Sequence, residues 1–321
     1  MSTVSGMYEE TPLQKRDGKL TVRMAVGLAA PHTFAASVCP ALFGILYCVY
    51  RHFPIRIYEA VMLFAACVLM QASVNTINDY MDFISGADSA EDNVEKSDSI
   101  LVFSDLAPWR ALALGCSFLA IALLIGSYFV IRRGPAPLVI GVIGATVVVL
   151  YSAGPLPVSH LPVGELVSGF TMGGLIPLGI TAAVTGEIHP EVLIYSIPFM
   201  VGIGLIMMTN NTCDIEKDLR AGRMTLPDTI GRPHSVRLYR SLVLVWIVSI
   251  FLYALSLHPL AGAFGALMLI PGYLFAFRYL MQSPLIPQTR IAQMKGILKA
   301  NLTGSAICLV ILAAVAVTGR L

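Results

Sequence analysis

The sequence predicts an all-α polytopic membrane protein, with about nine transmembrane helices around a central cavity and polar cap loops on one side. Hydrophobic residues make up 56% of the chain and charged residues 12%, whereas a soluble domain carries roughly 25% charged residues. The mean hydropathy of +0.77 agrees with this class. Apolar runs recur along the chain at the length of about 20 residues that a bilayer-spanning helix needs. Long polar segments separate these runs on one side only, which is typical of loops that cover a site.

Nine apolar runs are expected to span the membrane, and several contain Gly or Pro, which membrane helices tolerate. They cover residues 26–50, 57–80, 108–131, 136–153, 163–184, 191–212, 236–257, 260–281 and 297–318. The polar start of the chain precedes a full-length span without a small-residue cleavage site, so it is interpreted as a tail and not a signal peptide. We therefore expect a tail at 1–25 and one transmembrane domain at 26–321, with cap loops at 81–107, 154–162 and 213–235.

The distribution of basic residues predicts which side the loops face, because cytoplasmic loops carry the excess of Lys and Arg. With the N-terminus in the cytoplasm, the 21 Lys and Arg residues fall on the cytoplasmic side with five exceptions: Arg51, Arg56, Arg132, Arg133 and Arg320. The cap loops are then cytoplasmic. A net charge of +2 gives no indication of nucleic-acid binding, and six cysteines without a CxxC pair indicate neither zinc nor a disulfide framework.

Two acidic clusters stand at the ends of the second and sixth runs, and each opens on asparagine. The first reads Asn78-Asp79-Tyr80-Met81-Asp82, followed by Ser85-Gly86-Ala87-Asp88, and the second reads Asn210-Asn211-Thr212-Cys213-Asp214-Ile215-Glu216-Lys217-Asp218. The chain has only 19 Asp and Glu residues, and an ionisable group inside the bilayer costs on the order of 2.5–3.5 kcal/mol. Two such clusters, four spans apart, predict a functional site and hint at an internal repeat.

The spacing within each cluster favours binding of a divalent metal and phosphate. If the second span stays helical to about residue 83, Asn78 and Asp82 share a face, and so do Asn75 and Asp79. Asn210, Asp214 and Asp218 follow the same spacing. Mg²⁺ takes carboxylate, phosphate and water oxygens, so two facing clusters predict metal ions that bridge a diphosphate and act as Lewis acids. Basic residues that could bind its oxygens follow the second cluster: Lys217, Arg220 and Arg223.

The clusters admit two other interpretations. One cluster alone is often a helix cap or an exposed loop, but a pair on the same side is poorly explained in that way. A cation-coupled transporter would also place carboxylates in the membrane. That class predicts acidic residues near the middle of helices, whereas these lie at helix ends beside long polar loops.

These motifs resemble those of the UbiA superfamily of intramembrane aromatic prenyltransferases, with an NDxxD-type motif after the second helix and DxxxD after the sixth. Finer features are similar to its MenA branch, which prenylates 1,4-dihydroxy-2-naphthoate in menaquinone synthesis. They are Asp82 to Asp88, the tract from Asn210 to Leu226, and Tyr151-Ser152-Ala153-Gly154-Pro155-Leu156-Pro157 leading to Gly164-Glu165. The chain departs from the pattern where Ala30-Pro31 replaces Arg-Pro, and where residues 97–107 lack an arginine.

The resemblance implies Mg²⁺-dependent transfer of a polyprenyl group from a polyprenyl diphosphate to an aromatic acceptor, in a bacterial inner membrane. The acceptor implied is 1,4-dihydroxy-2-naphthoate, with 4-hydroxybenzoate or homogentisate as alternatives. Two Mg²⁺ ions would be held by Asn75, Asn78, Asp79, Asp82 and Asp88 on one side and by Asn210, Asn211, Asp214 and Asp218 on the other. Asp79, Asp82, Asp214 and Asp218 would be the catalytic residues. Lys96, Lys217, Arg220 and Arg223 would bind the diphosphate. Tyr151 and Ser152 would line the pocket for the aromatic substrate.

The fifth run is rich in glycine, at Gly169, Gly173, Gly174 and Gly179. Small residues let membrane helices approach closely, or they leave room for a prenyl tail. The sequence favours neither explanation over the other.

Overall fold

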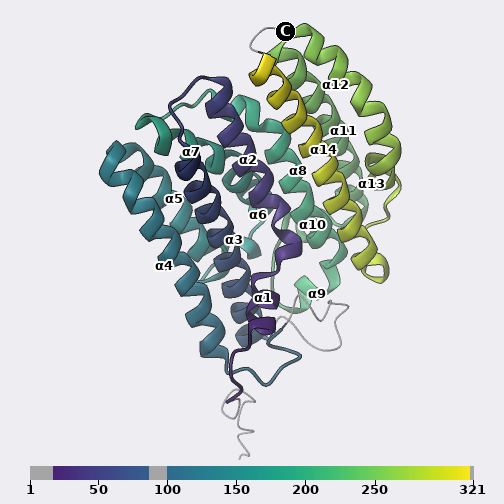
Figure 1. Cartoon of the computed structure of the whole chain (residues 1–321). Helices are drawn as coiled ribbons and strands as arrows, with labels where there is room; N and C mark the ends of the chain where they lie inside the picture. The colour runs from purple at the N-terminus through teal and green to yellow at the C-terminus, as the bar shows by residue number, and fades with distance from the viewer. Residues whose placement is uncertain (1–16, 87–99, 319–321) are drawn as a thin grey trace, which may run out of the picture.

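The computed structural model describes residues 17–86 and 100–318, and within these ranges the regular elements are helical (Figure 1). The helices are α1 (Val22–Ala29), η2 (Pro31–Thr33), α2 (Ala35–Tyr50), α3 (Ile57–Ser85), α4 (Pro108–Arg133), α5 (Pro135–Ser152), η3 (Val158–His160), α6 (Gly164–Phe170), η4 (Thr171–Leu175), α7 (Ile176–Thr185), α8 (Val192–Cys213), α9 (Ile215–Arg220), α10 (Leu226–Ile230), α11 (Arg232–Leu257), α12 (Pro259–Gly272), η5 (Tyr273–Phe277), α13 (Arg278–Gln282), η6 (Pro287–Thr289) and α14 (Arg290–Thr318). The predicted all-α fold is confirmed.

Eight helical stretches in the described part of the chain are long and apolar enough to cross a membrane. They are Ile57–Ser85, Pro108–Arg133, Pro135–Ser152, Gly164–Thr185, Val192–Cys213, Arg232–Leu257, Pro259–Gln282 and Pro287–Thr318. The segment from α1 to α2 gives a ninth when the bent pair is counted as one span. The predicted membrane architecture of about nine spans is therefore confirmed.

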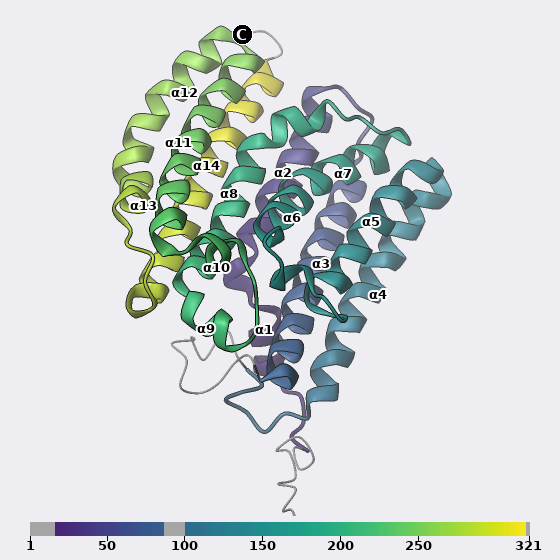
Figure 2. The same cartoon turned by 180° about the vertical axis from the view of Figure 1, so that it is seen from behind.

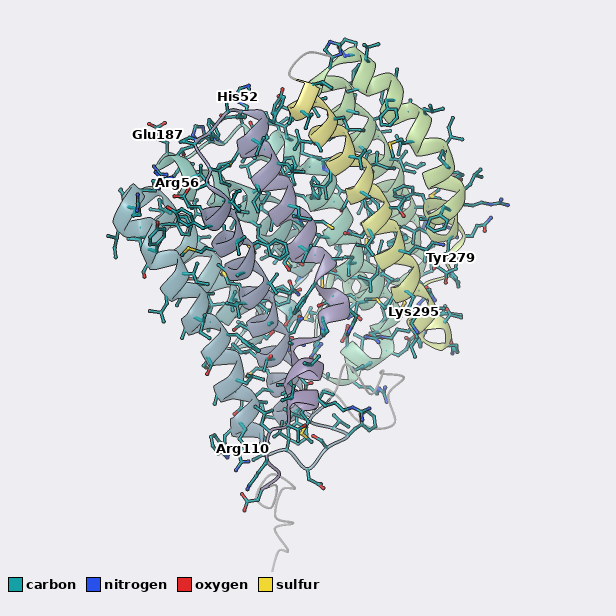
Figure 3. The ribbon with its side chains drawn as sticks, viewed as in Figure 1. His52, Arg56, Arg110, Glu187, Tyr279 and Lys295 are labelled. Carbon is teal, nitrogen blue, oxygen red and sulfur yellow. The ribbon has the colours of Figure 1, made fainter. Side chains whose placement is uncertain are left out.

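The spans form two groups joined by a middle layer (Figures 1 and 2). α3, α4 and α5 lie on one side and α11 to α14 on the other, while α2, α6, α7 and α8 lie between them. α2 contacts both α7 and α14, and α8 contacts α6, α11 and α14. α1, α9 and α10 lie at one end of the bundle, here called the site end. Figure 3 shows Arg110 and Lys295 toward this end, and His52, Arg56 and Glu187 at the opposite end.

The first predicted span, 26–50, is wrong as a single straight helix. The chain bends by 64° between α1 and α2, where Ala30 has a φ of 48° and the next residue, Pro31, has no N–H to donate. The end of a helix leaves carbonyls without a donor in their own helix, and such a carbonyl is costly inside a bilayer unless it finds a donor elsewhere. α3 supplies one, because the side-chain amide of Asn75 donates to Ala29 O at 2.8 Å. The bend thus depends on a contact between distant parts of the chain.

Two of the predicted cap loops, 81–107 and 213–235, contain α-helix, and the third, 154–162, contains the short 3₁₀ helix η3. α3 continues to Ser85 and ends at Gly86, whose φ of 69° is the left-handed conformation that commonly stops a helix. The start of the predicted loop 81–107 is therefore helix. The predicted loop 213–235 contains α9 and α10, and α11 already begins at Arg232. The predicted loops are too long because helical hydrogen bonding continues into the polar residues beyond each apolar run.

The glycines of the α6–η4 stretch are explained mainly by close packing. A Cβ added at Gly173 would lie 2.4 Å from Met200 N, and one added at Gly169 would lie 2.5 Å from Met200 O. Both clashes are with the α8 backbone, which cannot move aside as a side chain can. Gly179 lines the cavity described below, so it leaves room there.

We expect Gly173→Ala to destabilise the protein, because an extra methyl group in a well-packed interior costs about 1–3 kcal/mol. The measurement is the thermal unfolding midpoint in detergent. Gly141→Ala is the matched control, since a Cβ at Gly141 would meet nothing within 4 Å. Equal midpoints for the two variants would contradict the packing explanation.

Candidate active site

The two acidic motifs reach one cavity of about 570 Å³ between the helices. The last turns of α3 supply the first motif, and the end of α8 with α9 supplies the second. The motif residues that line the cavity are Asn75, Asn78, Asp79, Asp82, Asn210, Asn211, Asp214 and Lys217. Away from this polar end the wall is largely apolar, with residues from α2 to α8 and α14. The cavity therefore joins a polar end to an apolar chamber.

The predicted spacing places the motif residues on common faces. In α3, the amide of Asn78 donates to Asp82 Oδ2 at 2.8 Å. α8 formally ends at Cys213, but Asp214 N still donates to Asn210 O at 3.0 Å, and Asp218 N donates to Asp214 O at 2.8 Å. These bonds link α8 to α9 across Asp214, whose φ of −99° and ψ of 10° mark a break between the two helices. Asn210 and Asp214 line the cavity, whereas Asp218 is not among its lining residues.

One guanidinium group joins the two motifs. Arg223 donates through Nη2 to Asp82, and its Nη1 lies 3.6 Å from Asp218 Oδ1. The backbone around it is fixed, because Arg223 N donates to Asp218 O at 2.9 Å and Met224 N donates to His160 O at 3.0 Å. The segment between α9 and α10 is thereby tied to both motifs and to the short cap segment that contains His160.

A second arginine, Arg290, was not predicted as a site residue. Its Nε lies 2.9 Å from Asp214, and its Nη2 donates to Asn210 Oδ1 at 2.6 Å. Arg290 is the first residue of α14 and lines the cavity. Its sequence signal was weak, a single basic residue at the site end of the last span, with nothing to show which motif it would contact.

The two residues predicted for the aromatic pocket lie beside the first motif. The Ser152 hydroxyl donates to Asn78 Oδ1 at 2.7 Å, and Tyr151 lines the cavity. In the described structure Oε2 of Glu165 is buried without a hydrogen-bond partner. The other carboxylate oxygen of Glu165 accepts from Asn211 Nδ2 at 2.8 Å. A buried carboxylate oxygen with spare hydrogen-bonding capacity thus lies next to Asn211 of the second motif.

Other predicted ligands hold neighbouring segments in place. The Asp79 carboxylate accepts from Ile100 N at 3.0 Å and from Leu101 N at 3.4 Å. These two bonds anchor the segment that precedes α4. Asn75 holds the bend between α1 and α2. Both side chains still line the cavity.

The predicted diphosphate-binding residues separate into two groups. Arg223 and Lys217 line the cavity, whereas Arg220 is exposed, with its Nε donating to Glu216 O at 3.2 Å. The predicted residues Asp88 and Lys96 lie outside the described residues.

The carboxyl group of Asp218 in the second motif is harder to ionise than an ordinary carboxyl group. The pKa of Asp218 is raised to about 7, chiefly by burial, and the nearby carboxylates of Asp214 and Asp228 act in the same direction. The attraction of Arg223 and Lys217 opposes this rise without cancelling it. An additional cation near these carboxylates would favour their ionised forms.

The residues around the polar end fit Mg²⁺. Their carboxylate and amide oxygens are the hard donors that this ion prefers, and Mg²⁺ commonly takes only one or two carboxylates together with phosphate and water. Among residues 17–86 and 100–318 there is no cluster of three or more His, Cys, Asp or Glu poised to bind a metal. The arrangement therefore suits an ion shared with a substrate phosphate better than a closed protein site.

Comparison with known proteins agrees with this geometry. The UbiA prenyltransferase family model matches residues 37–295. The chain is 34% identical over 227 residues to the 1,4-dihydroxy-2-naphthoate octaprenyltransferase of Bacillus subtilis (strain 168), covering 70% of this chain and 72% of that protein.

Two solved structures share the fold. A UbiA homolog from Archaeoglobus fulgidus bound to GPP and Mg²⁺ aligns with a TM-score of 0.60 and 16% identity, over 88% of this chain and 99% of that one. The apo structure of a UbiA homolog from Aeropyrum pernix K1 aligns with a TM-score of 0.63 and 17% identity, over 89% and 98% of the two chains. At these identities the likeness concerns the fold alone.

A helical membrane bundle with this family match is a prenyltransferase embedded in the bilayer. The chain belongs to the UbiA prenyltransferase family. The predicted resemblance is confirmed, and its similarity to the MenA branch agrees with the Bacillus relative. The alternative of a cation-coupled transporter is wrong.

The raised pKa of Asp218 predicts a pH-dependent stability in the absence of divalent metal. The folded state holds this proton more tightly than the unfolded chain does, so the stabilisation is complete below the ordinary carboxyl pKa of 3.8 and is lost as the pH rises through about 7. We expect the unfolding midpoint in detergent with chelator to fall between about pH 5 and about pH 8. Asp218→Asn should flatten this fall, and an identical fall in the variant would contradict the assignment.

Proposed function

We propose that the protein transfers a polyprenyl group from a polyprenyl diphosphate to 1,4-dihydroxy-2-naphthoate, with Mg²⁺, as a step of menaquinone biosynthesis. The observation that carries the proposal is the cavity, where two carboxylate motifs from different helices meet at the polar end of an apolar chamber. The similarity to the Bacillus octaprenyltransferase supports the choice of acceptor.

The proposed site residues form two sets: one set binds the metal ions and the other binds the diphosphate. We propose that Asp79, Asp82, Asp214 and Asp218, with Asn78 and Asn210, hold two Mg²⁺ ions. When bound, Mg²⁺ neutralises the charge that develops on the departing diphosphate. Lys217, Arg223 and Arg290 then offer N–H groups to phosphate oxygens, a role that suits the guanidinium fork. The carboxylate partners of both arginines in this structure keep these cations at the polar end.

The remainder of the cavity suits the prenyl chain and the reacting ring. Its apolar wall, which includes Met70, Phe129, Ile140 and Val148, accommodates the tail and excludes water from the allylic cation formed when the carbon–oxygen bond breaks. The ring carbon that carries the carboxylate then forms the new carbon–carbon bond, and the carboxylate leaves as CO₂. Tyr151 lines the cavity and Ser152 donates to Asn78 of the first motif, and we propose that the acceptor binds beside them.

We further propose that the site end faces the cytoplasm, in a bacterial inner membrane. The basic residues favour this orientation, since Arg51, Arg56, Arg132 and Arg133 lie near the ends of the spans opposite the site.

Replacing any one of Asp79, Asp82, Asp214 and Asp218 by Asn should lower kcat by at least about 100-fold, since a preorganised charge interaction in an active site is typically worth that much. Mg²⁺-dependent release of diphosphate from a prenyl donor, measured in detergent, is the assay. Glu187→Gln is the control, because this exposed carboxylate lies at the opposite end (Figure 3). Near-normal activity in all four variants would overturn the metal assignment.

A competition assay tests the acceptor. With one polyprenyl diphosphate and equal amounts of 1,4-dihydroxy-2-naphthoate, 4-hydroxybenzoate and homogentisate, we expect mass spectrometry to show mainly the decarboxylated naphthalenediol product. A main product from either other acceptor would leave the enzyme class intact and move the protein to a different pathway.

A further inference from the structure

The last part of the chain is basic without any acidic residue. No Asp or Glu follows Asp228, whereas the basic residues beyond it are Arg232, Arg237, Arg240, Arg278, Arg290, Lys295, Lys299 and Arg320. Two of these pair with carboxylates from earlier in the chain: Arg232 with Glu216 and Arg290 with Asp214. The helices α11 to α14 cannot balance their own charge.

Four of these cations form what is here called the outer basic patch: Arg237, Arg240, Arg278 and Lys299. Within residues 17–86 and 100–318, none of them has a carboxylate partner, and none lines the cavity. Nε of Arg240 is buried without a hydrogen-bond partner in this part of the structure. Lys299 Nζ lies 3.5 Å from the centre of the exposed Phe275 ring. An unmatched buried donor is costly, so the patch has capacity for an acceptor.

The patch lies at one level of the bundle. With a rise of 1.5 Å per residue, Arg240, Arg278 and Lys299 stand about 26–28 Å from the far ends of their helical stretches. The helices are neighbours, because α13 contacts both α11 and α14, and the Tyr279 ring packs where a Cβ on Gly296 would be. Figure 3 shows Tyr279 on this flank, above Lys295. Since the hydrocarbon core is about 30 Å thick, this level corresponds to a headgroup boundary.

Apolar stripes run from the patch toward the opposite end of the bundle. On α11 the exposed residues beyond the patch include Leu244, Val248 and Leu252, each more than half exposed. The α12–α13 stretch exposes Leu267, Ile270 and Leu274, and α14 exposes Leu302 and Val310. Cations at one level therefore adjoin apolar surface that extends through the depth of the bilayer.

We propose that the outer basic patch binds the headgroup of an anionic phospholipid, whose acyl chains lie along the exposed stripes of α11 to α14. Clustered basic residues between membrane helices recognise anionic headgroups in this way. A free phosphate would contact the cations of the patch but would make no contact with the apolar stripes. Simple extension of long basic side chains into water would not leave Arg240 Nε buried. The site is separate from the reaction cavity.

The test is thermal unfolding of the detergent-purified protein with added phosphatidylglycerol, phosphatidylcholine or inorganic phosphate. We expect phosphatidylglycerol to raise the midpoint well above the other two. The variant Arg240→Gln/Arg278→Gln/Lys299→Gln should lose this increment, whereas Arg132→Gln, which changes an exposed cation at the opposite end, should keep it. Equal increments with phosphatidylcholine or with phosphate alone would overturn the proposal, as would a triple variant that keeps the increment.

Native mass spectrometry gives a readout that does not require the triple variant to fold well. Each basic group near an anionic surface contributes about 1 kcal/mol, so Lys299→Gln alone should weaken phosphatidylglycerol binding by roughly fivefold. Unchanged lipid binding in this single variant and in Arg278→Gln would also overturn the assignment.

Discussion

The polar end of the cavity depends on one guanidinium group, that of Arg223, held between carboxylates from two distant helices. Buried carboxylates are tolerated in a membrane protein only when a counterion and hydrogen bonds offset their loss of water. The planar fork of arginine can serve two carboxylates at once, which a lysine ammonium does less well. From Ser152 the network runs through Asn78 and Asp82 to Arg223 and then Asp218. Removing the guanidinium would leave the carboxylates of Asp82 and Asp218 without this shared counterion.

A cation bound beside this network would favour the ionised form of Asp218, and this matches the proposed chemistry. Burial still dominates the pKa of Asp218 despite Arg223 and Lys217, so an additional cation nearby would favour ionisation of this carboxyl group. Arginines that bind carboxylates in the free protein are equally suited to phosphate oxygens. Under the proposed function, Mg²⁺ and diphosphate together restore the balance, because the metal compensates the carboxylates while the arginines bind the anion.

The sequence predicted what depends on local pattern and missed what depends on distant contacts. Span positions follow from hydropathy, and the facing motif residues follow from helical spacing, so both could be read directly. The bend after α1 could not, because it requires a positive φ at Ala30 and an amide from Asn75 in another helix. Arg290 was missed for the same reason. Arg220 follows the same motif as Arg223 but is exposed, since nearness in sequence does not determine which side of a short helix faces the cavity.

The uneven distribution of charge along the chain also ties the last helices to the second motif. Helices α11 to α14 contain basic residues and no acidic ones, so each of their cations must find a partner outside the group. Arg232 forms a two-pronged pair with Glu216 at 2.6 and 2.7 Å, and Arg290 pairs with Asp214. Both contacts attach this group to the helices that carry the second motif, and the first removes Glu216 from the set of available metal ligands. The cations that remain on the outer flank can be balanced only from outside the described chain, and in a bilayer the nearest abundant anions are lipid headgroups.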